Sequence, residues 1–289
     1  MSVEANMPGE TASPNQVVIE ARSRWLDVPL RAIWQYRELL FFLVWRDVKV
    51  RYKQTALGVM WILLQPLLST MIFTVIFGIL LEAPSGQVPY ALFVLAGMIP
   101  WNYFSSSLTR SSGSVVASSN LITKVYFPRL IIPMAGVLAG LVDFLIVCTA
   151  LGGMMAFYGV RPTANIALLP LFLLLAMLTA FGFGLWLSAL NVRYRDVNWL
   201  MPFLIQVWMY LTPVVYSSTL LPERFRPYLA LNPLTGVVEG FRWALFGESM
   251  GSAAPGGLMF AISIAIAIVV LLSGLVYFRR TERTFADII

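Results

Sequence analysis

The sequence predicts an all-α integral membrane protein with six transmembrane helices per chain. Of its 289 residues, 59% are hydrophobic and only 12% are charged, whereas about 25% charged residues are usual in a soluble domain. The mean hydropathy is +0.79, and a water-soluble globule of this size cannot bury so much apolar surface. The charged residues are separated by six long, nearly uncharged runs. Helices are the expected form of such runs, because they satisfy their own backbone hydrogen bonds in lipid.

Two scarce residue types exclude several kinds of site. The chain has one cysteine, Cys148, and no histidine. An intrachain disulfide, a thiolate or imidazole metal site and a Ser/His or Cys/His catalytic dyad are therefore excluded. The net charge of +6 and the pI of about 9.6 predict basic cytoplasmic loops and contact with anionic membrane lipid rather than with nucleic acid.

The N-terminal part divides into a polar tail, residues 1–28, and a basic amphipathic helix, residues 29–57. The tail lacks a basic region followed by an apolar run, so no cleaved signal peptide is expected. In the helix, apolar residues recur at three- and four-residue steps between charged ones, which is typical of a helix at a membrane surface. It is either a lipid anchor or a docking surface for a cytoplasmic partner. Its apolar positions are Ile33, Trp34, Phe41, Val44, Trp45 and Val48.

Residues 58–279 form the predicted transmembrane domain, and a cytoplasmic tail follows at 280–289. Each uncharged run holds the ~20 residues that a helix needs to cross a bilayer. Most of the 20 Lys and Arg residues lie in the N-terminal segment, the second-to-third and fourth-to-fifth connections and the tail. The positive-inside rule therefore places both termini in the cytoplasm. The expected spans are 59–81, 89–109, 131–157, 166–190, 198–217 and 257–278.

The second-to-third connection, residues 105–133, is rich in serine and glycine, and its centre is too polar for lipid. We expect a short cytoplasmic helix at about 118–127, because the side chain of Ser119 or Asn120 suits a helix cap. Such a helix, held between two spans, either transmits a push from a soluble partner or is a solvated connector.

The fifth-to-sixth connection, residues 218–256, is expected outside the cell. Asn232 and Pro233 suit a helix start, and Gly247 suits its end after Phe246. Glu239 lies three residues before Arg242, so the two side chains are placed to pair. Together with a shorter helix at 222–230, this segment predicts a hairpin, residues 222–246, that dips into the outer leaflet and narrows a pore mouth.

Inside the spans, one acidic residue and several glycines stand out. Asp143 is an intramembrane acid, which costs roughly 2.5–3.5 kcal/mol on insertion scales and is a functional candidate by default. It is either a satisfied structural partner within the bundle or part of a transport pathway. Gly136 and Gly140 form a GxxxG pattern that indicates close helix packing, and Gly182 and Gly184 are interpreted in the same way. Pro66, Pro100, Pro202 and Pro213 interrupt spans and predict kinks.

Aromatic residues make up 13% of the chain. One interpretation is the belt of aromatic side chains found at both membrane interfaces. The other is a ladder of ring faces along a pore, on which the weakly apolar faces of sugars slide. The candidates for such a lining are Trp61, Trp101, Tyr103, Phe104, Trp208, Tyr210 and Tyr216.

Five segments resemble the permease subunit of type-2 ABC exporters, and most of all the branch that exports O-antigen, capsule and teichoic-acid polysaccharides. The resemblance covers about residues 30–280 and does not extend to the first 25 residues. The segments, in chain order, are RYKQTALGVMWILLQP (51–66), NLITKVYFPRLIIP (120–133), NVRYRDV (191–197), TPVVYS (212–217) and LNPLTGVVEGFRWALFG (231–247).

The resemblance implies a homodimer in the bacterial inner membrane, driven by a dimer of separate ATP-binding-cassette subunits. ATP and magnesium are then bound by that partner, and this chain needs no cofactor of its own, which agrees with its lack of a GxxxxGK[ST] motif. The cargo implied is a polysaccharide linked to a lipid such as undecaprenyl pyrophosphate. The amphipathic helix resembles the interface helix of the family, 118–127 its coupling helix and 222–246 its periplasmic gate helices.

With the cargo and partner that the resemblance implies, we expect roles for three groups of residues. Arg51, Lys53 and Arg129 are the expected cations for the lipid pyrophosphate, because arginine binds phosphate in a fork and lysine as a point charge. ATPase coupling is expected at Asn120, Leu121, Lys124, Tyr126 and Arg46. The periplasmic gate is expected at Glu239, Arg242 and Trp243.

Three alternatives remain on the sequence alone. The same fold also suits a type-2 exporter of small lipophilic compounds. A secondary carrier would require Asp143 in its transport pathway. A membrane-embedded glycan enzyme is disfavoured, because the chain has no histidine and no clustered acids, and no HExxH or GxSxG motif stands out.

Overall fold

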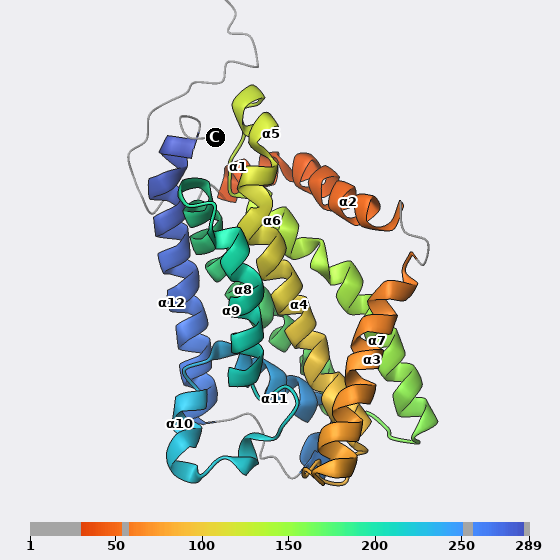
Figure 1. Ribbon diagram of the computed structural model, residues 1–289. Helices are drawn as coiled ribbons and strands as arrows, with labels where there is room; N and C mark the ends of the chain where they lie inside the picture. Colours follow the sequence, from red (N-terminus) through yellow and green to blue (C-terminus); the bar gives the residue numbers. More distant parts are fainter. Residues whose placement is uncertain (1–29, 54–57, 251–256, 286–289) are drawn as a thin grey trace, which may run out of the picture.

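The computed structural model of the chain describes residues 30–53, 58–250 and 257–285, and within these ranges it is helical without strands. The predicted polar tail at 1–28, the end of the amphipathic helix at 54–57 and the last residues of the tail, 286–289, lie outside the described residues. Figure 1 shows long helices side by side, with α2 (Arg37–Lys53) and α5 (Ser119–Lys124) at one end of the bundle and α10 (Arg226–Leu229) and α11 (Pro233–Phe246) at the other. We refer to these as the α5 end and the α11 end.

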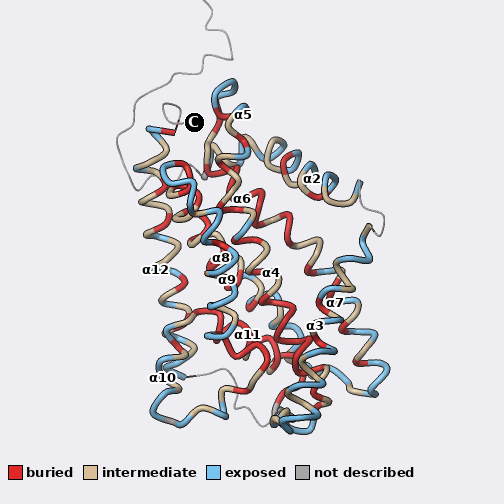
Figure 2. The backbone as a smooth tube through the Cα atoms, in the orientation of Figure 1, coloured by how far each residue is buried: buried red, intermediate tan, exposed pale blue. Residues whose placement is uncertain are grey.

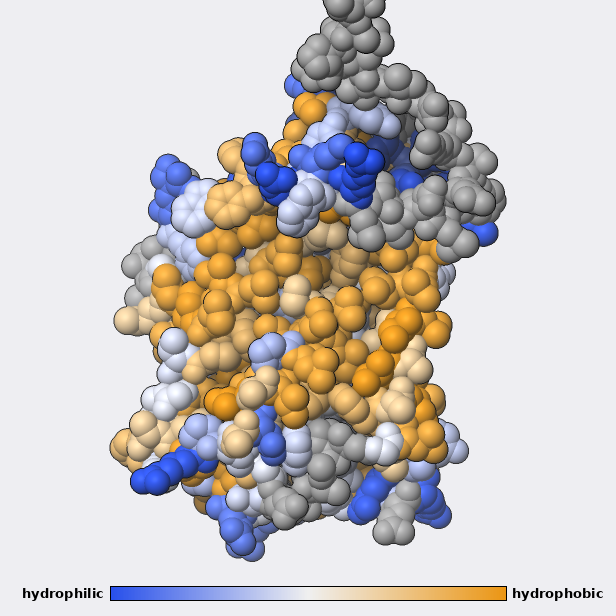
Figure 3. All heavy atoms as spheres, turned by 180° about the vertical axis from the view of Figure 1, so that it is seen from behind, coloured by the Kyte–Doolittle hydropathy of each residue, from blue (hydrophilic) through white to orange (hydrophobic). Residues whose placement is uncertain are grey.

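Four helical segments are long and apolar enough to cross a membrane, namely Met60–Leu80, Ile131–Phe157, Ala164–Arg193 and Leu258–Thr284. They correspond to α3 (Met60–Phe73) with the π-helical Thr74–Leu80, α6 (Ile131–Leu138) with α7 (Gly140–Phe157), the 3-10 turn Ala164–Leu168 with α8 (Leu169–Arg193), and α12 (Leu258–Thr281) with the turn Glu282–Thr284. An orange apolar band between two ends that carry blue polar residues is visible in Figure 3. The chain is thus helical and apolar, as predicted, while the count of six spans stays a prediction.

The fifth predicted span, 198–217, is shorter than expected. The helix α9 (Val197–Leu211) ends at Leu211, and Thr212 already has an extended backbone. The residue before a proline is driven out of the helical region by its ring, and Pro213 follows. The sequence prediction was wrong here because it interpreted Pro213 as a kink within a span, whereas the proline marks the end of the helix.

The second predicted span is longer than expected, because α4 (Tyr90–Ala117) continues through the serine-rich segment as one helix of 28 residues. Expecting a connector from 105 onward was therefore wrong. Hydroxyl groups bond back to carbonyls three or four residues earlier, as Ser106 does to Tyr103 and Ser112 to Thr109. Such local bonds satisfy a hydroxyl inside an apolar bundle. Ser107, Ser111 and Ser112 are buried.

The helix α4 is the centre of the bundle, in contact with α3, α6, α7, α8, α9 and α11. Red, buried stretches follow it and α11 in Figure 2. A second apolar cluster at the α5 end joins α2 through Leu43, α5 through Ile122, α6 through Ile131, α8 through Leu185 and α12 through Phe278.

The short helix that sequence places at 118–127 is α5, and this cluster holds α5 and α2 to the same end of the bundle. The helix α5 begins at Ser119, so Ser119 and Asn120 lie inside it and the expectation that one of them caps it was wrong. Ser118 precedes the helix, and its side chain makes no capping bond. The amphipathic helix is divided into α1 (Leu30–Gln35) and α2.

The α11 end confirms the predicted helix signals. The Asn232 side chain accepts a hydrogen bond from the Leu234 amide, Pro233 is the first helical residue, and Gly247 ends α11 with a φ of 61°. A left-handed φ of this size is tolerated best by glycine. The shorter preceding helix is present as the turn Glu223–Phe225 followed by α10.

Glycines allow the central helices to approach closely, as the GxxxG pattern predicted. A Cβ atom on Gly140 would meet Ser107 Oγ at 2.6 Å, and one on Gly182 would meet the Leu271 backbone of α12 at 2.8 Å. Close approach of this kind is how helices associate in lipid. Of the interrupting prolines, Pro66, Pro100 and Pro202 lie inside α3, α4 and α9.

We predict that Gly182→Ala lowers stability by about 1–3 kcal/mol, the usual cost of overpacking, because its Cβ would press on the backbone of α12, which cannot rotate away. The measurement is the thermal unfolding midpoint in detergent. Gly152→Ala on α7 is the control, since its Cβ would meet nothing within 4 Å. Equal midpoints for the two variants would contradict the close packing.

Candidate functional site

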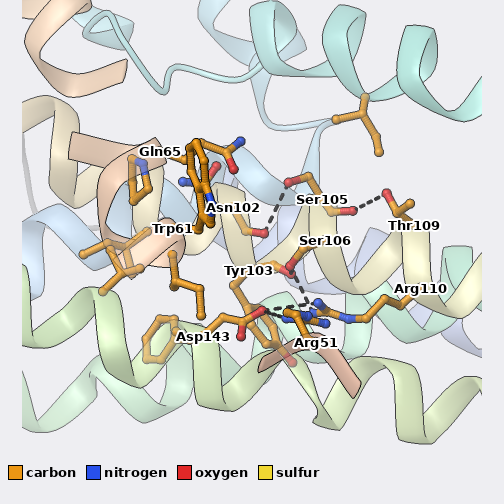
Figure 4. Close-up of a pocket in the computed structure, with 16 residues that line it drawn as sticks. Arg51, Trp61, Gln65, Asn102, Tyr103, Ser105, Ser106, Thr109, Arg110 and Asp143 are labelled. Atoms are coloured by element: carbon orange, nitrogen blue, oxygen red, sulfur yellow. Dashed lines mark hydrogen bonds and ion pairs between the residues drawn. The ribbon is translucent and has the colours of Figure 1, made fainter. Parts of the chain in front are cut away.

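A cavity of about 430 Å³ lies among α2, α3, α4, α7 and α9. Polar side chains gather on its α4 wall, where Asn102, Ser106 and Thr109 recur at helical spacing. Trp61 and Gln65 come from α3, and Asp143 comes from α7 (Figure 4). The remaining lining residues are Arg51, Ile62, Pro66, Ile99, Tyr103, Ser105, Arg110, Phe144, Val147 and Ile205.

The polar wall exists because α4 turns a different face to each neighbour. Its apolar residues, such as Leu95 and Phe104, are fully buried in the core. Asn102, Ser105 and Ser106 are half-buried and line the cavity. Since three- and four-residue steps return to the same face of a helix, the sequence of α4 places Asn102, Ser105, Ser106 and Thr109 on one stripe that faces the cavity.

An ionic cluster forms part of the cavity wall, and its side chains come from three helices. The Arg51 guanidinium at the end of α2 donates to Asp143 Oδ2, and Arg110 Nη1 of α4 lies 3.3 Å from the same oxygen. The Tyr52 hydroxyl donates to Asp143 Oδ1 at 2.6 Å. Figure 4 shows Arg51 and Arg110 converging on the Asp143 carboxylate. Asp143 is thus a satisfied structural partner, as one of its two sequence interpretations expected. It also lines the cavity, while its part in a transport pathway stays a prediction.

Arg110 is the member of this site that sequence reasoning missed. The sequence predicts a polar connection over 105–133, whereas Arg110 lies on α4 and also donates to the Gly136 carbonyl at 3.0 Å and to Ser106 Oγ at 3.1 Å. The available signal was the spacing of Arg110, which lies one and two turns after Ser106 and Tyr103. That spacing has meaning only once the serine-rich segment is taken as helix.

The predicted aromatic lining is divided between the cavity and the core. Trp61 and Tyr103 line the cavity. Trp101 and Phe104 are buried, and Phe104 packs edge-on against Trp208, with ring centroids 5.0 Å apart. Tyr210 is exposed, and its carbonyl accepts a hydrogen bond from the Tyr216 hydroxyl at 3.0 Å. The structure does not bring these seven residues into one row.

The predicted phosphate cations are likewise separated. Arg51 lies in the cavity wall, and Lys53 at the end of α2 is exposed. Arg129, between α5 and α6, donates to the Glu282 carbonyl and lies over the Phe285 ring. Arg129 therefore belongs to a contact with the C-terminal segment and not to the cavity.

The predicted coupling residues gather at the α5 end. Asn120, Leu121 and Lys124 lie on α5, and Tyr126 follows it with 76% of its surface exposed. Arg46 on α2 forms an ion pair with Asp47 at 2.9 Å. An exposed aromatic side chain beside basic residues at one end of the bundle suits a contact with another protein.

At the α11 end, Arg242 is buried. The expected pairing of Arg242 with Glu239 is not formed. Its guanidinium donates to the carbonyls of Phe93 at 3.0 Å, Pro213 at 2.7 Å and Val214, and it lies 3.7 Å from the Phe93 ring centroid. Arginine is suited to this because its planar fork carries five donors. Arg242 thus fastens α11 to α4 and to the segment that follows α9, while Trp243 is half-buried beside it.

We predict that Asp143→Leu destabilises the protein by about 1–3 kcal/mol, less than the loss of one partner costs in a fully buried ion pair, because the cluster is partly exposed and Arg51 and Arg110 would be left facing each other. The thermal unfolding midpoint in detergent measures the loss. Asp196→Leu, at the exposed turn between α8 and α9, is the control and should change the midpoint little. A midpoint for Asp143→Leu equal to that of the control would contradict the structural role of the cluster.

Comparison with known proteins identifies the family of the chain. The ABC-2 type transporter family matches residues 38–246 of the chain. The O-antigen export system permease protein RfbA of Klebsiella pneumoniae is 30% identical over 87% of this chain and 95% of its own length, and the Myxococcus xanthus RfbA is 29% identical over 88% and 96%. The polysialic acid transport protein KpsM of Escherichia coli is 25% identical over 82% of this chain and 91% of its own length. The chain therefore belongs to the ABC-2 type transporter family of membrane permeases.

Proposed function

We propose that this chain is the membrane-spanning permease of an ATP-driven exporter that moves a polysaccharide across the bacterial inner membrane. The observation that carries the proposal is near full-length similarity to permeases named for O-antigen and polysialic acid export. The cavity supports it, because hydroxyls, amides and the aromatic faces of Trp61 and Tyr103 are groups that suit a hydroxyl-rich sugar chain inside an apolar bundle. We take the cargo to be lipid-linked.

The functional unit proposed is a homodimer with six spans per copy and both termini in the cytoplasm. Two apolar surfaces support a partner within the membrane. In the most apolar stretch of Met60–Leu80, only 11% is buried within the bundle. The helix α9 likewise exposes Trp199, Phe203 and Tyr210. Lipid alone would also cover such surfaces. A channel for a polymer, however, needs a wall on each side, and one six-span bundle with a filled core offers one wall.

A separate ATPase is proposed to bind the α5 end. The sequence has no GxxxxGK[ST] motif, so nucleotide binding is assigned to a partner chain. The helices α2 and α5 share one apolar cluster, and a push on α5 would therefore reach α2 and the ends of α8 and α12 together. ATP and magnesium would be bound by the partner and not by this chain.

We predict that deleting the gene removes surface polysaccharide and leaves resistance to small lipophilic compounds unchanged. Expression of the full chain should restore the polysaccharide when the ATPase subunit encoded beside it is present. It should not restore the polysaccharide without that subunit. Immunoblotting of surface polysaccharide and growth in the presence of such compounds are the two measurements. Intact polysaccharide with lost resistance would instead identify an exporter of small lipophilic compounds.

We predict that Tyr126→Ala weakens copurification with the ATPase by about tenfold or more, because truncating an aromatic anchor at an interface costs about 2 kcal/mol or more. Tyr158→Ala is the matched control, since Tyr158 is also exposed but follows α7 at the opposite end of the bundle. Pull-down of the ATPase at graded concentrations measures the effect. Equal recovery with the two variants would place the docking surface elsewhere.

A further inference from the structure

A second cavity, of about 500 Å³, lies beneath α2 and adjoins the first. Its walls come from α2, from the second half of α4 and from α6, and they include the ion pair of Arg46 with Asp47 as well as Ser114 and Ser118. Three residues, Arg51, Thr109 and Arg110, line both cavities. The inner cavity among the spans and the outer cavity under the surface helix therefore meet at the two arginines of the ionic cluster.

The contact between the two cavities is held by Asp143. Its Oδ2 atom accepts hydrogen bonds from Arg51 of α2 and Arg110 of α4, while its Oδ1 atom accepts one from the Tyr52 hydroxyl. Asp143 lines the inner cavity and not the outer one. A group that arrives through the outer cavity thus meets the two guanidinium groups before it reaches the carboxylate.

The charges of the cluster do not cancel. Two guanidinium groups share one carboxylate, so one positive charge is left over, at a place where 18–30% of the side-chain surfaces is exposed. A pyrophosphate that joins a lipid to a sugar carries more negative charge and more non-bridging acceptor oxygens than one carboxylate, and arginine binds such oxygens through paired donors. Phosphate is therefore a better partner for this pair of arginines than the single carboxylate that holds them.

We propose that the cluster is an exchange gate for a phosphate-bearing headgroup. A phosphate group that enters beneath α2 binds Arg51 and Arg110 in place of the Asp143 carboxylate. Once the carboxylate is released from the arginines, the headgroup can pass into the inner cavity. Sugar that follows the phosphate then meets Gln65, Asn102 and the Trp61 ring. This inference rests on the proposed function for the nature of the cargo, and it adds Arg110 as a ligand and Asp143 as an internal competitor.

A competitor and a structural bridge respond oppositely to substitution, and this makes the gate testable. We would measure binding of a polyprenyl phosphate to the full-length chain in nanodiscs by native mass spectrometry, with the uncharged polyprenol as reference. Asp143→Asn should tighten polyprenyl phosphate binding about tenfold, and Arg110→Gln should weaken it about tenfold, on the scale of one charge-assisted contact. Polyprenol binding should not change. Arg195→Gln, at an exposed turn, is the control.

Unchanged or weaker phosphate binding by Asp143→Asn would overturn the proposal, because Asp143 would then be a structural bridge only. If that variant does not fold, Arg51→Gln and Arg110→Gln decide the matter, since unchanged phosphate binding in both also overturns it. Inorganic pyrophosphate is the second probe. If it binds with the same dependence on the variants while the polyprenyl phosphate does not bind, the exchange stands and its ligand is a soluble phosphate. None of these results depends on export in cells, so failure of the gate is distinct from failure of the proposed function.

Discussion

The second half of α4 must be helical, polar and buried at once, and the rest of the structure depends on how this is achieved. The hydroxyls of Ser106 and Ser112 bond to carbonyls of the same helix, and that of Ser107 bonds to the Val137 carbonyl of α6. Glycines on the neighbouring helices leave room for these side chains. A Cβ on Gly136 would crowd the α4 backbone at Ser111, at 3.1 Å. Because an unpaired polar group costs several kcal/mol in a dry interior, these local bonds are the condition under which a serine-rich helix can occupy the centre of a membrane bundle.

The same helix links the two ends of the molecule. At the α11 end, the Phe93 carbonyl of α4 accepts from Arg242, and the Tyr90 hydroxyl donates to the Val215 carbonyl beyond α9. At the α5 end, α4 passes directly into α5 after Ser118. The helix α4 therefore joins the contacts at the α5 end to those around α9 and α11. Asn191 strengthens this connection, since its amide bonds the Ser112 carbonyl and the Asn198 side chain of α9.

The ionic cluster has a different character from the Arg242 contacts. Arg242 is 3% exposed and bonds only backbone carbonyls, and such partners cannot leave without unfolding of a segment. Arg51 and Arg110 are bonded to a side chain at the junction of two cavities. An ion pair with access to solvent can exchange partners, because a competing anion replaces the lost attraction. Arg242 is therefore suited to fixing the α11 end, and Arg51 and Arg110 are suited to binding an anionic ligand.

The sequence alone determined the helical membrane class, the order of the elements and the signals at Asn232, Pro233 and Gly247, because composition and capping act over a few residues. It also singled out Asp143, since one acid in an apolar run is visible without a structure. Only the tertiary structure showed that Arg110 lies on a helix that the serine-rich segment continues, and that Arg51, Asp143 and Arg110 meet from three helices. The pairing of Arg242 with carbonyls instead of Glu239 was decided there as well. The physical reason is the same in each case: the partners are far apart in the chain, and hydrophobic packing around α4, which no local pattern records, brings them together.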